Sequence, residues 1–381
     1  MRVRVWTTLL PALAAFSAGC GGGSSHPASS TSSARTPPRT SATDPPRPRR
    51  PLALRFERVG RLPIPLQLPA VAPLGTDGAL VMGGLDQVDG SSSAILRVSG
   101  SAARQAGDLS TALHDAAAAT IGSRTLFIGG GNGGSSSSAI NLISPGGVTT
   151  HLGSLPVAAS DVAAAALGDA IYVVGGYDGA KPLDTIVRVT PAGRARVVAH
   201  MPRPLRYAAV AAAAGGIVIA GGTVGTNATD TVLRFDPTTR KVKRIGRLPA
   251  PVTHAAAVAI GDKAVVIGGR GSDVDSQRAT VLAVNPVTGR VRRAGHLPMP
   301  LSDVSAVASG SRVLMLGGRD AQGHVRDEIW SARAVGAPAD TASAAARDIY
   351  AADRPGHVAA AARHARAYVY VPTRPVGERP L

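Results

Sequence analysis

Six Gly-Gly pairs recur along this chain at nearly constant spacing, and this repeat limits the possible fold more than any other feature. Successive pairs are 46, 46, 46, 47 and 49 residues apart. The pairs are Gly83-Gly84, Gly129-Gly130, Gly175-Gly176, Gly221-Gly222, Gly268-Gly269 and Gly317-Gly318. A second column of residues, usually followed by Pro, keeps the same spacing at Leu62, Leu109, Leu155, Met201, Leu248 and Leu297. Two columns with one period predict a repeat architecture.

Each repeat contains four strand-like segments. In the fifth repeat they are residues 255–260, 264–267, 280–285 and 291–294. Turn-forming residues separate them, as in Gly261-Asp262 and in the segment 286–289. The first segment of most repeats is rich in Ala, and small side chains suit a place where several strands crowd around one axis. We therefore predict an all-β fold, a six-bladed β-propeller with one four-stranded blade for each repeat.

The order of motifs within a repeat resembles the kelch family. A hydrophobic strand leads into Gly-Gly, then into a Tyr-Asp-Pro-like turn, and the repeat leaves through Leu-Pro. Phe235-Asp236-Pro237 and Val284-Asn285-Pro286 are the best copies of the turn. The resemblance covers roughly residues 53–334, although Val, Ile or Phe mostly replaces the Tyr and Trp of the family. It implies a kelch-like propeller over residues 53–335.

The ends of the repeat region predict how the ring closes. Residues 53–63 look like a fourth strand but precede the first Gly-Gly pair, whereas the last repeat lacks a fourth strand after residues 328–334. We therefore expect the N-terminal strand to complete the last blade, which removes the exposed edge of an open ring.

The N-terminus predicts export and lipidation. Arg2 and Arg4 precede a short apolar run, and Ser17-Ala18-Gly19 leads into Cys20, the one cysteine of the chain. Residues 1–19 have the character of a secretory signal peptide, and the segment resembles a bacterial lipobox, although Ser17 stands where that motif prefers Leu. The resemblance implies acylation of Cys20. An ordinary secretory signal with a chance cysteine is the alternative.

Two further segments lie outside the repeats. Residues 20–52, which begin at the predicted lipidated cysteine, are rich in Gly, Ser, Thr, Pro and Arg, a composition typical of a disordered tether. Residues 336–381 form a C-terminal tail, in which segments 348–353 and 367–372 resemble the start of a YVTN-type propeller. The tail is interpreted as a truncated domain of that type or as strands that dock on the first propeller.

The formal net charge of +17 permits two interpretations, attraction to an anionic surface or polymer and a solvated, Arg-biased surface. We favour the second, since Arg outnumbers Lys throughout the chain. Accordingly we expect no nucleic-acid partner and a monomeric protein, whose membrane contact is the lipid anchor.

No sequence motif predicts catalysis. Gly129, Gly131 and Gly134 match a dinucleotide-binding pattern, but a strand follows them where that motif requires a helix. Some kelch-like propellers are copper oxidases with a Tyr–Cys crosslink, and Cys20 on the tether cannot supply it. We expect no catalytic residue, no metal ligands and no cofactor.

One set of polar residues stands out as a candidate ligand site. The residue before the first strand of each repeat forms a column that we align as Ala70, Asp115, Asp161, Tyr207, His254 and Asp303, and Arg206 precedes Tyr207. In a propeller these positions surround one mouth of the central channel. They could form a ring that binds a ligand or cation, or they could merely cap the strands with short polar side chains.

These features together predict a membrane-anchored, extracytoplasmic lipoprotein whose propeller is a platform for an unknown protein or carbohydrate ligand. The alternative is a carbohydrate-active enzyme, an isomerase or hydrolase, that uses the aspartates at the channel mouth. Fold resemblance cannot choose between these functions.

Overall fold

The structure, a computed structural model, describes residues 51–335. The signal peptide, Cys20, most of the tether and the C-terminal tail of the sequence analysis lie outside these residues. The described chain contains strands β1 to β26 and no helix, which confirms the predicted all-β fold. It therefore contains no helix that could cross a membrane.

Strand pairing forms five sheets, and the nine-stranded sheet consists of two antiparallel units that are joined by a parallel bridge between β1 and β22. We call each antiparallel unit a blade. Blade 1 contains β2 (Ala70–Leu74), β3 (Gly78–Met82), β4 (Ala94–Ser99) and β5 (Ala102–Asp108). Blade 2 contains β6 (Ala117–Ile121), β7 (Arg124–Ile128), β8 (Ala139–Ile143) and β9 (Thr149–Ser154). Blade 3 contains β10 (Ala163–Leu167), β11 (Ala170–Val174), β12 (Thr185–Val189) and β13 (Ala195–His200).

The remaining blades carry longer outer strands. Blade 4 contains β14 (Ala209–Ala213), β15 (Gly216–Ala220), β16 (Thr223–Val224), β17 (Asn227–Asp236) and β18 (Lys241–Val252). Blade 5 contains β19 (Ala256–Ile260), β20 (Lys263–Ile267), β21 (Arg278–Val284) and β22 (Val291–Ser302). Blade 6 contains β23 (Ser305–Ser309), β24 (Arg312–Leu316), β26 (Glu328–Val335) and β1 (Ala53–Arg61). The short β25 (Arg319–Asp320), which lies between β24 and β26 in the chain, pairs with β22 of blade 5. The prediction that the fifth repeat ends its last strand at Ala294 was wrong, because β22 continues to pair with β21 as far as Leu301.

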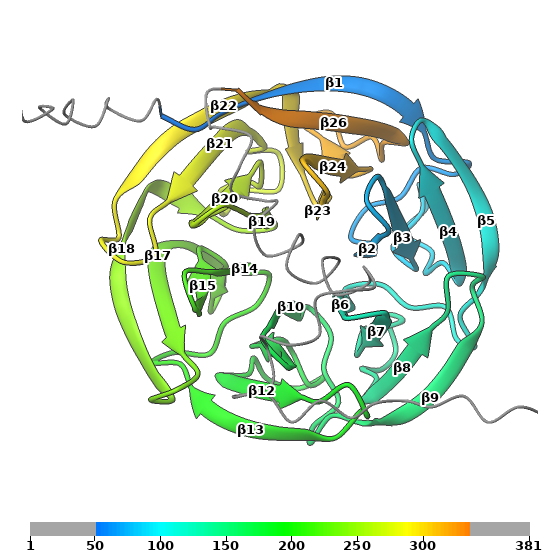
Figure 1. Cartoon of the computed structure of the whole chain (residues 1–381), viewed down its shortest axis with the longest axis horizontal. Coiled ribbons are helices and arrows are strands. Elements are labelled where there is room, and N and C mark those ends of the chain that lie inside the picture. Colours follow the sequence, from blue (N-terminus) through cyan, green and yellow to red (C-terminus); the bar gives the residue numbers. More distant parts are fainter. Residues whose placement is uncertain (1–50, 336–381) are drawn as a thin grey trace, which may run out of the picture. The chain divides into compact units, whose positions relative to one another are not determined.

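The blades surround a common centre, with the first strand of each blade innermost (Figure 1). These inner strands contact one another in a closed cycle, β2 to β6, β10, β14, β19, β23 and back to β2. The inner strand β10 reads Ala-Ala-Ala-Ala-Leu, and such small side chains leave room for its neighbours around the axis. The fold is therefore a β-propeller, as the repeat predicts.

The ring closes through the N-terminal strand, which confirms the prediction from the ends of the repeats. β1 pairs antiparallel with β26, from Ala53 opposite Val335 to Arg61 opposite Glu328. A bridge between Leu54 and Gly295 also joins β1 to β22 of blade 5. Blade 6 thus combines the first and last described strands, and its β26 edge is covered.

The Gly-Gly pairs join neighbouring blades. In blade 3, the N–H of Gly176 donates to the carbonyl oxygen of Leu205 in the connection to blade 4, at 2.9 Å. The other five pairs make the equivalent bond, and the last one runs from Gly318 in blade 6 to Leu66, which leads into blade 1. Gly175 has a φ of +61°, and a Cβ at this residue would lie 2.1 Å from the Leu205 oxygen. A close backbone contact between blades therefore explains the repeated pair.

The hydrophobic core lies between the blades. One buried cluster, for example, joins Ile128 of blade 2 to Ile171 and Val189 of blade 3. Its neighbour joins Tyr172 of blade 3 to Phe235 of blade 4, whose rings are tilted at a centroid distance of 5.5 Å. Because these clusters link successive blades, the propeller holds the connections at its channel mouth in fixed positions.

Candidate functional site

Six residues, one from each blade, surround one mouth of the channel and form what we call the mouth column. They are Leu68, Asp115, Asp161, Tyr207, His254 and Asp303, and each has a φ between +51° and +57°. The alignment of Ala70 with this column was wrong, because Ala70 is already the first residue of β2. Leu68 has the equivalent left-handed backbone, two residues before the inner strand, so the first blade contributes an apolar side chain.

Backbone hydrogen bonds link the mouth column into a ring. The N–H of Asp303 donates to the carbonyl of His254 at 2.9 Å, and the N–H of His254 donates to the carbonyl of Tyr207 at 3.3 Å. The ring closes between the last and first blades, where the N–H of Leu68 donates to the carbonyl of Asp303 at 2.8 Å. Tyr207 donates in the same way to Asp161, and Asp115 to Leu68, whereas the carbonyl of Asp115 accepts from the N–H of Val162, the residue after Asp161. All six carbonyl oxygens of the column therefore accept a backbone hydrogen bond.

Arg206 is the counter-ion of Asp161. Its Nε donates to Asp161 Oδ2, and its Nη2 lies 3.3 Å from the hydroxyl of Tyr207. The guanidinium lies 4.4 Å from the ring centroid of Tyr177 and 5.1 Å from that of Tyr207. Arg206 therefore forms an ion pair with one of the mouth aspartates, Asp161.

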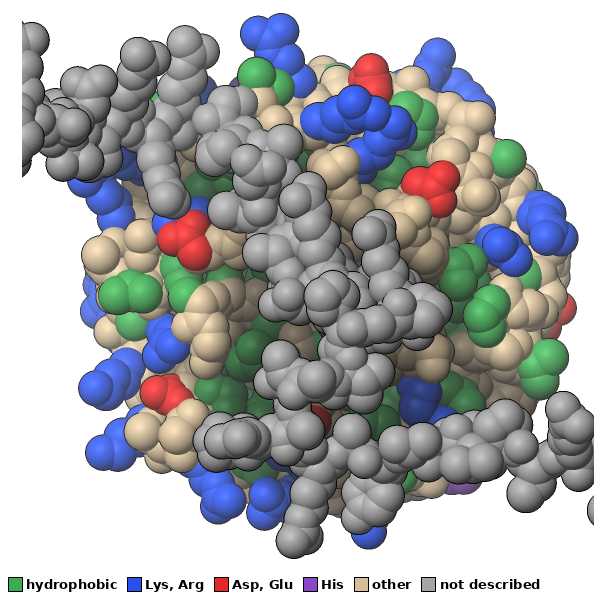
Figure 2. Space-filling view, viewed as in Figure 1, with side chains coloured by type: hydrophobic (Ala, Val, Ile, Leu, Met, Phe, Trp, Pro, Cys, Tyr) green, Lys and Arg blue, Asp and Glu red, His purple; other side chains and the backbone are tan. Residues whose placement is uncertain are grey.

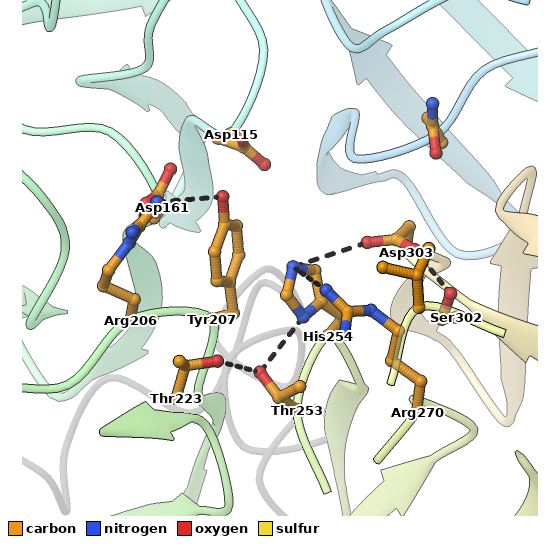
Figure 3. A network of polar contacts seen from close by, with 12 residues as sticks. Asp115, Asp161, Arg206, Tyr207, Thr223, Thr253, His254, Arg270, Ser302 and Asp303 are labelled. Carbon is orange, nitrogen blue, oxygen red and sulfur yellow. Dashed lines mark hydrogen bonds and ion pairs between the residues drawn. The ribbon is translucent and has the colours of Figure 1, made fainter. Parts of the chain in front are cut away.

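Tyr207 and His254 stack on each other at the mouth, with ring centroids 3.8 Å apart (Figure 3). Thr253 Oγ1 lies 3.0 Å from Nδ1 of His254, and Arg270 Nη2 lies 3.4 Å from its Nε2. Burial lowers the pKa of His254 to about 3, and the charges of Arg270 and Arg206 act in the same direction. The imidazole is therefore neutral at neutral pH.

Asp303 lies beside His254 and accepts a hydrogen bond from the hydroxyl of Ser302. Burial raises the pKa of Asp303 to about 6, although this hydrogen bond and the charges of Arg270 and Arg319 favour the ionised form. The Asp303 carboxylate thus has a hydrogen-bond donor and two cations near it. Its ionised form is nevertheless destabilised, because burial removes it from water.

Asp115 is the mouth aspartate without a counter-ion of its own. It is 8% exposed, and its Oδ1 has no hydrogen-bond partner among the described residues. Nε2 of His114 lies 3.7 Å from its Oδ2, but burial lowers the pKa of that histidine, which favours its neutral form. Burial and the negative charges of Asp161 and Asp303 raise the pKa of Asp115 well above its ordinary value.

The three aspartates line one pocket with a volume of about 130 Å³, together with Tyr207 and His254. In Figure 3 the carboxylates of Asp115 and Asp303 lie on different sides of this space. No group of three or more metal-binding side chains is positioned for a metal ion within residues 51–335. The polar side chains predicted from the sequence therefore do converge, but around a space wider than a metal site.

Simple capping does not explain the mouth aspartates. Among the described residues no backbone N–H donates to the carboxylates of Asp115, Asp161 or Asp303; their recorded contacts are with side chains. The left-handed backbone is a separate local reason for aspartate at these positions, because Asp is enriched there among residues other than Gly. It does not account for Leu68 and Tyr207.

A further column contributes to the site, and the sequence analysis missed it. It consists of the residues that follow the Gly-Gly pairs: Leu85, Gly131, Tyr177, Thr223, Arg270 and Arg319. Each pairs with the residue before the mouth column, as Arg270 does with Thr253. Their spacing from the glycines is constant, so the repeat itself carried the signal that would have found Arg270 and Tyr177.

The outer surface of the propeller carries many positively charged side chains. Lys and Arg side chains are spread around the periphery of the face shown in Figure 2. Exposed cations on the outer strands include Arg58, Arg104, Arg196, Lys243, Arg244, Arg292 and Arg293. The periphery therefore carries exposed cations, whereas the mouth combines three buried aspartates with Arg206, Arg270 and Arg319.

Comparison with known proteins identifies the repeat unit. Residues 158–191 and 204–249 match the Kelch motif. These two segments are similar to kelch repeats. The matched residues span the inner strands of blade 3 and nearly the whole of blade 4, including the Tyr177, Arg206 and Tyr207 side of the mouth. No curated protein matches this chain.

Proposed function

We propose that this chain is a binding protein, held by a lipid on Cys20 at the extracytoplasmic face of a membrane, whose kelch propeller recognises its ligand at the channel mouth. One observation carries the proposal: three buried aspartates from three different blades line a single open pocket. Buried carboxylates cost free energy unless a partner compensates them. A fold that keeps three of them together is well explained by a ligand that supplies donors.

The geometry of the mouth favours a binding function over the alternative, that of a carbohydrate-active enzyme. Sugar rings are commonly recognised by stacking on an exposed aromatic face, yet Arg206 and His254 lie on opposite sides of the Tyr207 ring (Figure 3). The pocket of about 130 Å³ is also smaller than the ~300–1,000 Å³ usual for sites that enclose a small molecule. It suits one functional group of a larger ligand.

A thermal-shift screen of amines, simple sugars and divalent cations tests the binding site. We expect at least one class of compound to raise the melting temperature of the wild type. Asp161→Ala should abolish that shift, because Arg206 then loses its counter-ion and the side chains of the pocket are no longer held in place. Asp169→Ala is the matched control, since Asp169 is an exposed aspartate that pairs with Arg188 at the other end of the same blade. Equal shifts in the two variants, or none in the wild type, would contradict the proposal.

The anchor is tested separately by Cys20→Ala. Two or more acyl chains, at ~0.8 kcal/mol per buried CH₂, hold a protein on a membrane far more firmly than one chain. We therefore expect the variant to move from the membrane fraction to the soluble or secreted fraction of the expressing bacterium. Unchanged partitioning would mean that Cys20 is not the anchor.

A further inference from the structure

The charges at the mouth are unevenly compensated. Asp161 has Arg206 as its partner, and Asp303 has the Ser302 hydroxyl with Arg270 and Arg319 nearby. Asp115 has no cationic partner in contact, and its Oδ1 is buried and unpaired among the described residues. The groups that face it are Asp161, Asp303, Arg206, His114 and Tyr207. A buried carboxylate in such surroundings calls for an added donor, preferably a cation.

The other polar groups of the pocket also restrict the ligand. The six carbonyl oxygens of the mouth column are already occupied by the backbone ring, and both faces of Tyr207 are covered. The unused groups are carboxylate oxygens, which accept hydrogen bonds and cannot donate them while ionised. A ligand group that pairs with these carboxylates in their ionised form must therefore be a donor.

The size of the mouth pocket favours an organic cation over a metal ion. A bare metal ion does not fit, because no described set of side chains converges on one point as metal ligands do. A cavity of about 150 Å³ can hold a benzene molecule, so the mouth pocket of about 130 Å³ has room for a group of a few non-hydrogen atoms. A –CH₂–NH₃⁺ group has this size and carries three donors.

We propose that the mouth pocket binds a primary alkylammonium group, with the Asp115 carboxylate as its counter-ion. This proposal rests on the proposed function, because it names the ligand chemistry of the same site. The group could belong to a lysine side chain of a partner protein or to a small amine. Both sources share the ammonium group and the hydrocarbon chain that leads to it.

The proposal has a pH signature. Burial and the neighbouring acids favour the protonated form of Asp115 in the free protein, so an ammonium ion binds with loss of that proton. Binding should therefore tighten as the pH rises through the raised pKa of Asp115, while the amine itself stays protonated. Calorimetry in two buffers of different ionisation enthalpy should detect release of up to about one proton per bound amine.

The test is a calorimetric titration of the propeller in its full chain with n-butylammonium and with Nα-acetyl-lysine methylamide. We expect Asp115→Asn to weaken binding about tenfold or more and to remove its pH dependence. Asparagine has nearly the same shape and is also tolerated in the left-handed backbone, so the variant should fold. Asp169→Asn is the control, and it should bind as the wild type does.

Several results would overturn this proposal. They are equal binding by Asp115→Asn, equal binding of the uncharged Nε-acetyl analogue, or no binding of either amine by the wild type. If sugars stabilise the wild type through Asp161 while amines do not bind, the mouth is still a binding site and its ammonium specificity is wrong. Tighter binding of a lysine-containing peptide than of butylammonium identifies a protein as the source of the group, and equal binding identifies a small amine.

Discussion

At the scale of single residues, the left-handed backbone conformation of the mouth column costs conformational free energy. Outside Gly, Asn and Asp this conformation costs roughly 1–2 kcal/mol per residue, and Leu68, Tyr207 and His254 all adopt it. Such strain persists where the surrounding structure imposes it, and it is concentrated at ligand sites. Here the backbone ring between blades imposes it, and the side chains at the same positions form the pocket.

The sequence predicted most of the polar residues of this site but not their contacts. Asp115, Asp161, Tyr207, His254 and Asp303 recur at one repeat position, so their convergence follows from the fold. Leu68 was missed because the left-handed turn before an inner strand leaves no clear mark in the sequence when an apolar residue adopts it. The sequence also could not predict which of the aspartates has a positively charged partner, because this depends on the distances between side chains.

Asp303→Asn should alter how stability depends on pH. The pKa of Asp303 is raised to about 6 in the folded state from about 3.9 in the unfolded chain, so the wild type loses stability as the pH rises through this interval. Asparagine has no such loss. The variant should therefore gain stability relative to the wild type between about pH 4 and pH 7, by up to about 3 kcal/mol.

Urea unfolding of both proteins at the two pH values measures this difference. His254 acts in the opposite direction, because its lowered pKa makes the folded state less stable as the pH falls from 6.5 towards about 3. The histidine is common to both proteins, so most of its effect cancels in the comparison. A difference in stability that does not change with pH would show that Asp303 is not destabilised by burial.

At the scale of strands and turns, the Gly-Gly pairs and the N-terminal strand both act between blades. The repeat period and the strands could be predicted from the sequence, because the Gly-Gly pairs recur there at a nearly constant spacing. The hydrogen bond from each second glycine to the segment that leads into the next blade could not be predicted, because its acceptor is a backbone carbonyl of varied residues such as Leu113, Ala159 and Val252.

Gly175→Ala tests the contact between blades 3 and 4. Gly168, in the turn between β10 and β11, has the same φ of +61°, but an added Cβ there would meet nothing within 4 Å. Gly168→Ala should therefore cost only the backbone strain, roughly 1–2 kcal/mol. Gly175→Ala adds a clash with the Leu205 carbonyl and should cost about 1–3 kcal/mol more. Equal losses of unfolding free energy in the two variants would mean that the blades do not depend on this close approach.

Removal of residues 53–61 tests the closure of the ring. This deletion takes away β1 and leaves β26 unpaired along its outer edge, so we expect aggregation or a large fall in the melting temperature. Deletion of residues 21–50, the predicted tether, should leave the melting temperature nearly unchanged. If the propeller tolerates both deletions equally, β1 does not close it.

At the scale of the whole molecule, a predicted lipid anchor and tether precede a rigid propeller whose mouth is lined by buried aspartates. The propeller follows from the repeat and is seen in the described residues. The anchor depends on Cys20, which lies outside them, and stays a prediction. The ligand could not be named from the sequence, because the covered faces of Tyr207 and the unpaired oxygen of Asp115 are properties of the assembled ring.

The location of binding is tested most directly by the histidine ring signals in a long-range ¹H–¹⁵N NMR spectrum, recorded while the compound that gives the largest thermal shift is added. His254 and His114 lie at the mouth, whereas His151 and His200 lie on the outer strands β9 and β13. His254→Gln assigns the signal of His254. Binding at the mouth predicts saturable changes at His254 and His114 with none at His151 and His200. Changes confined to the outer histidines, with His254 unmoved, would contradict it.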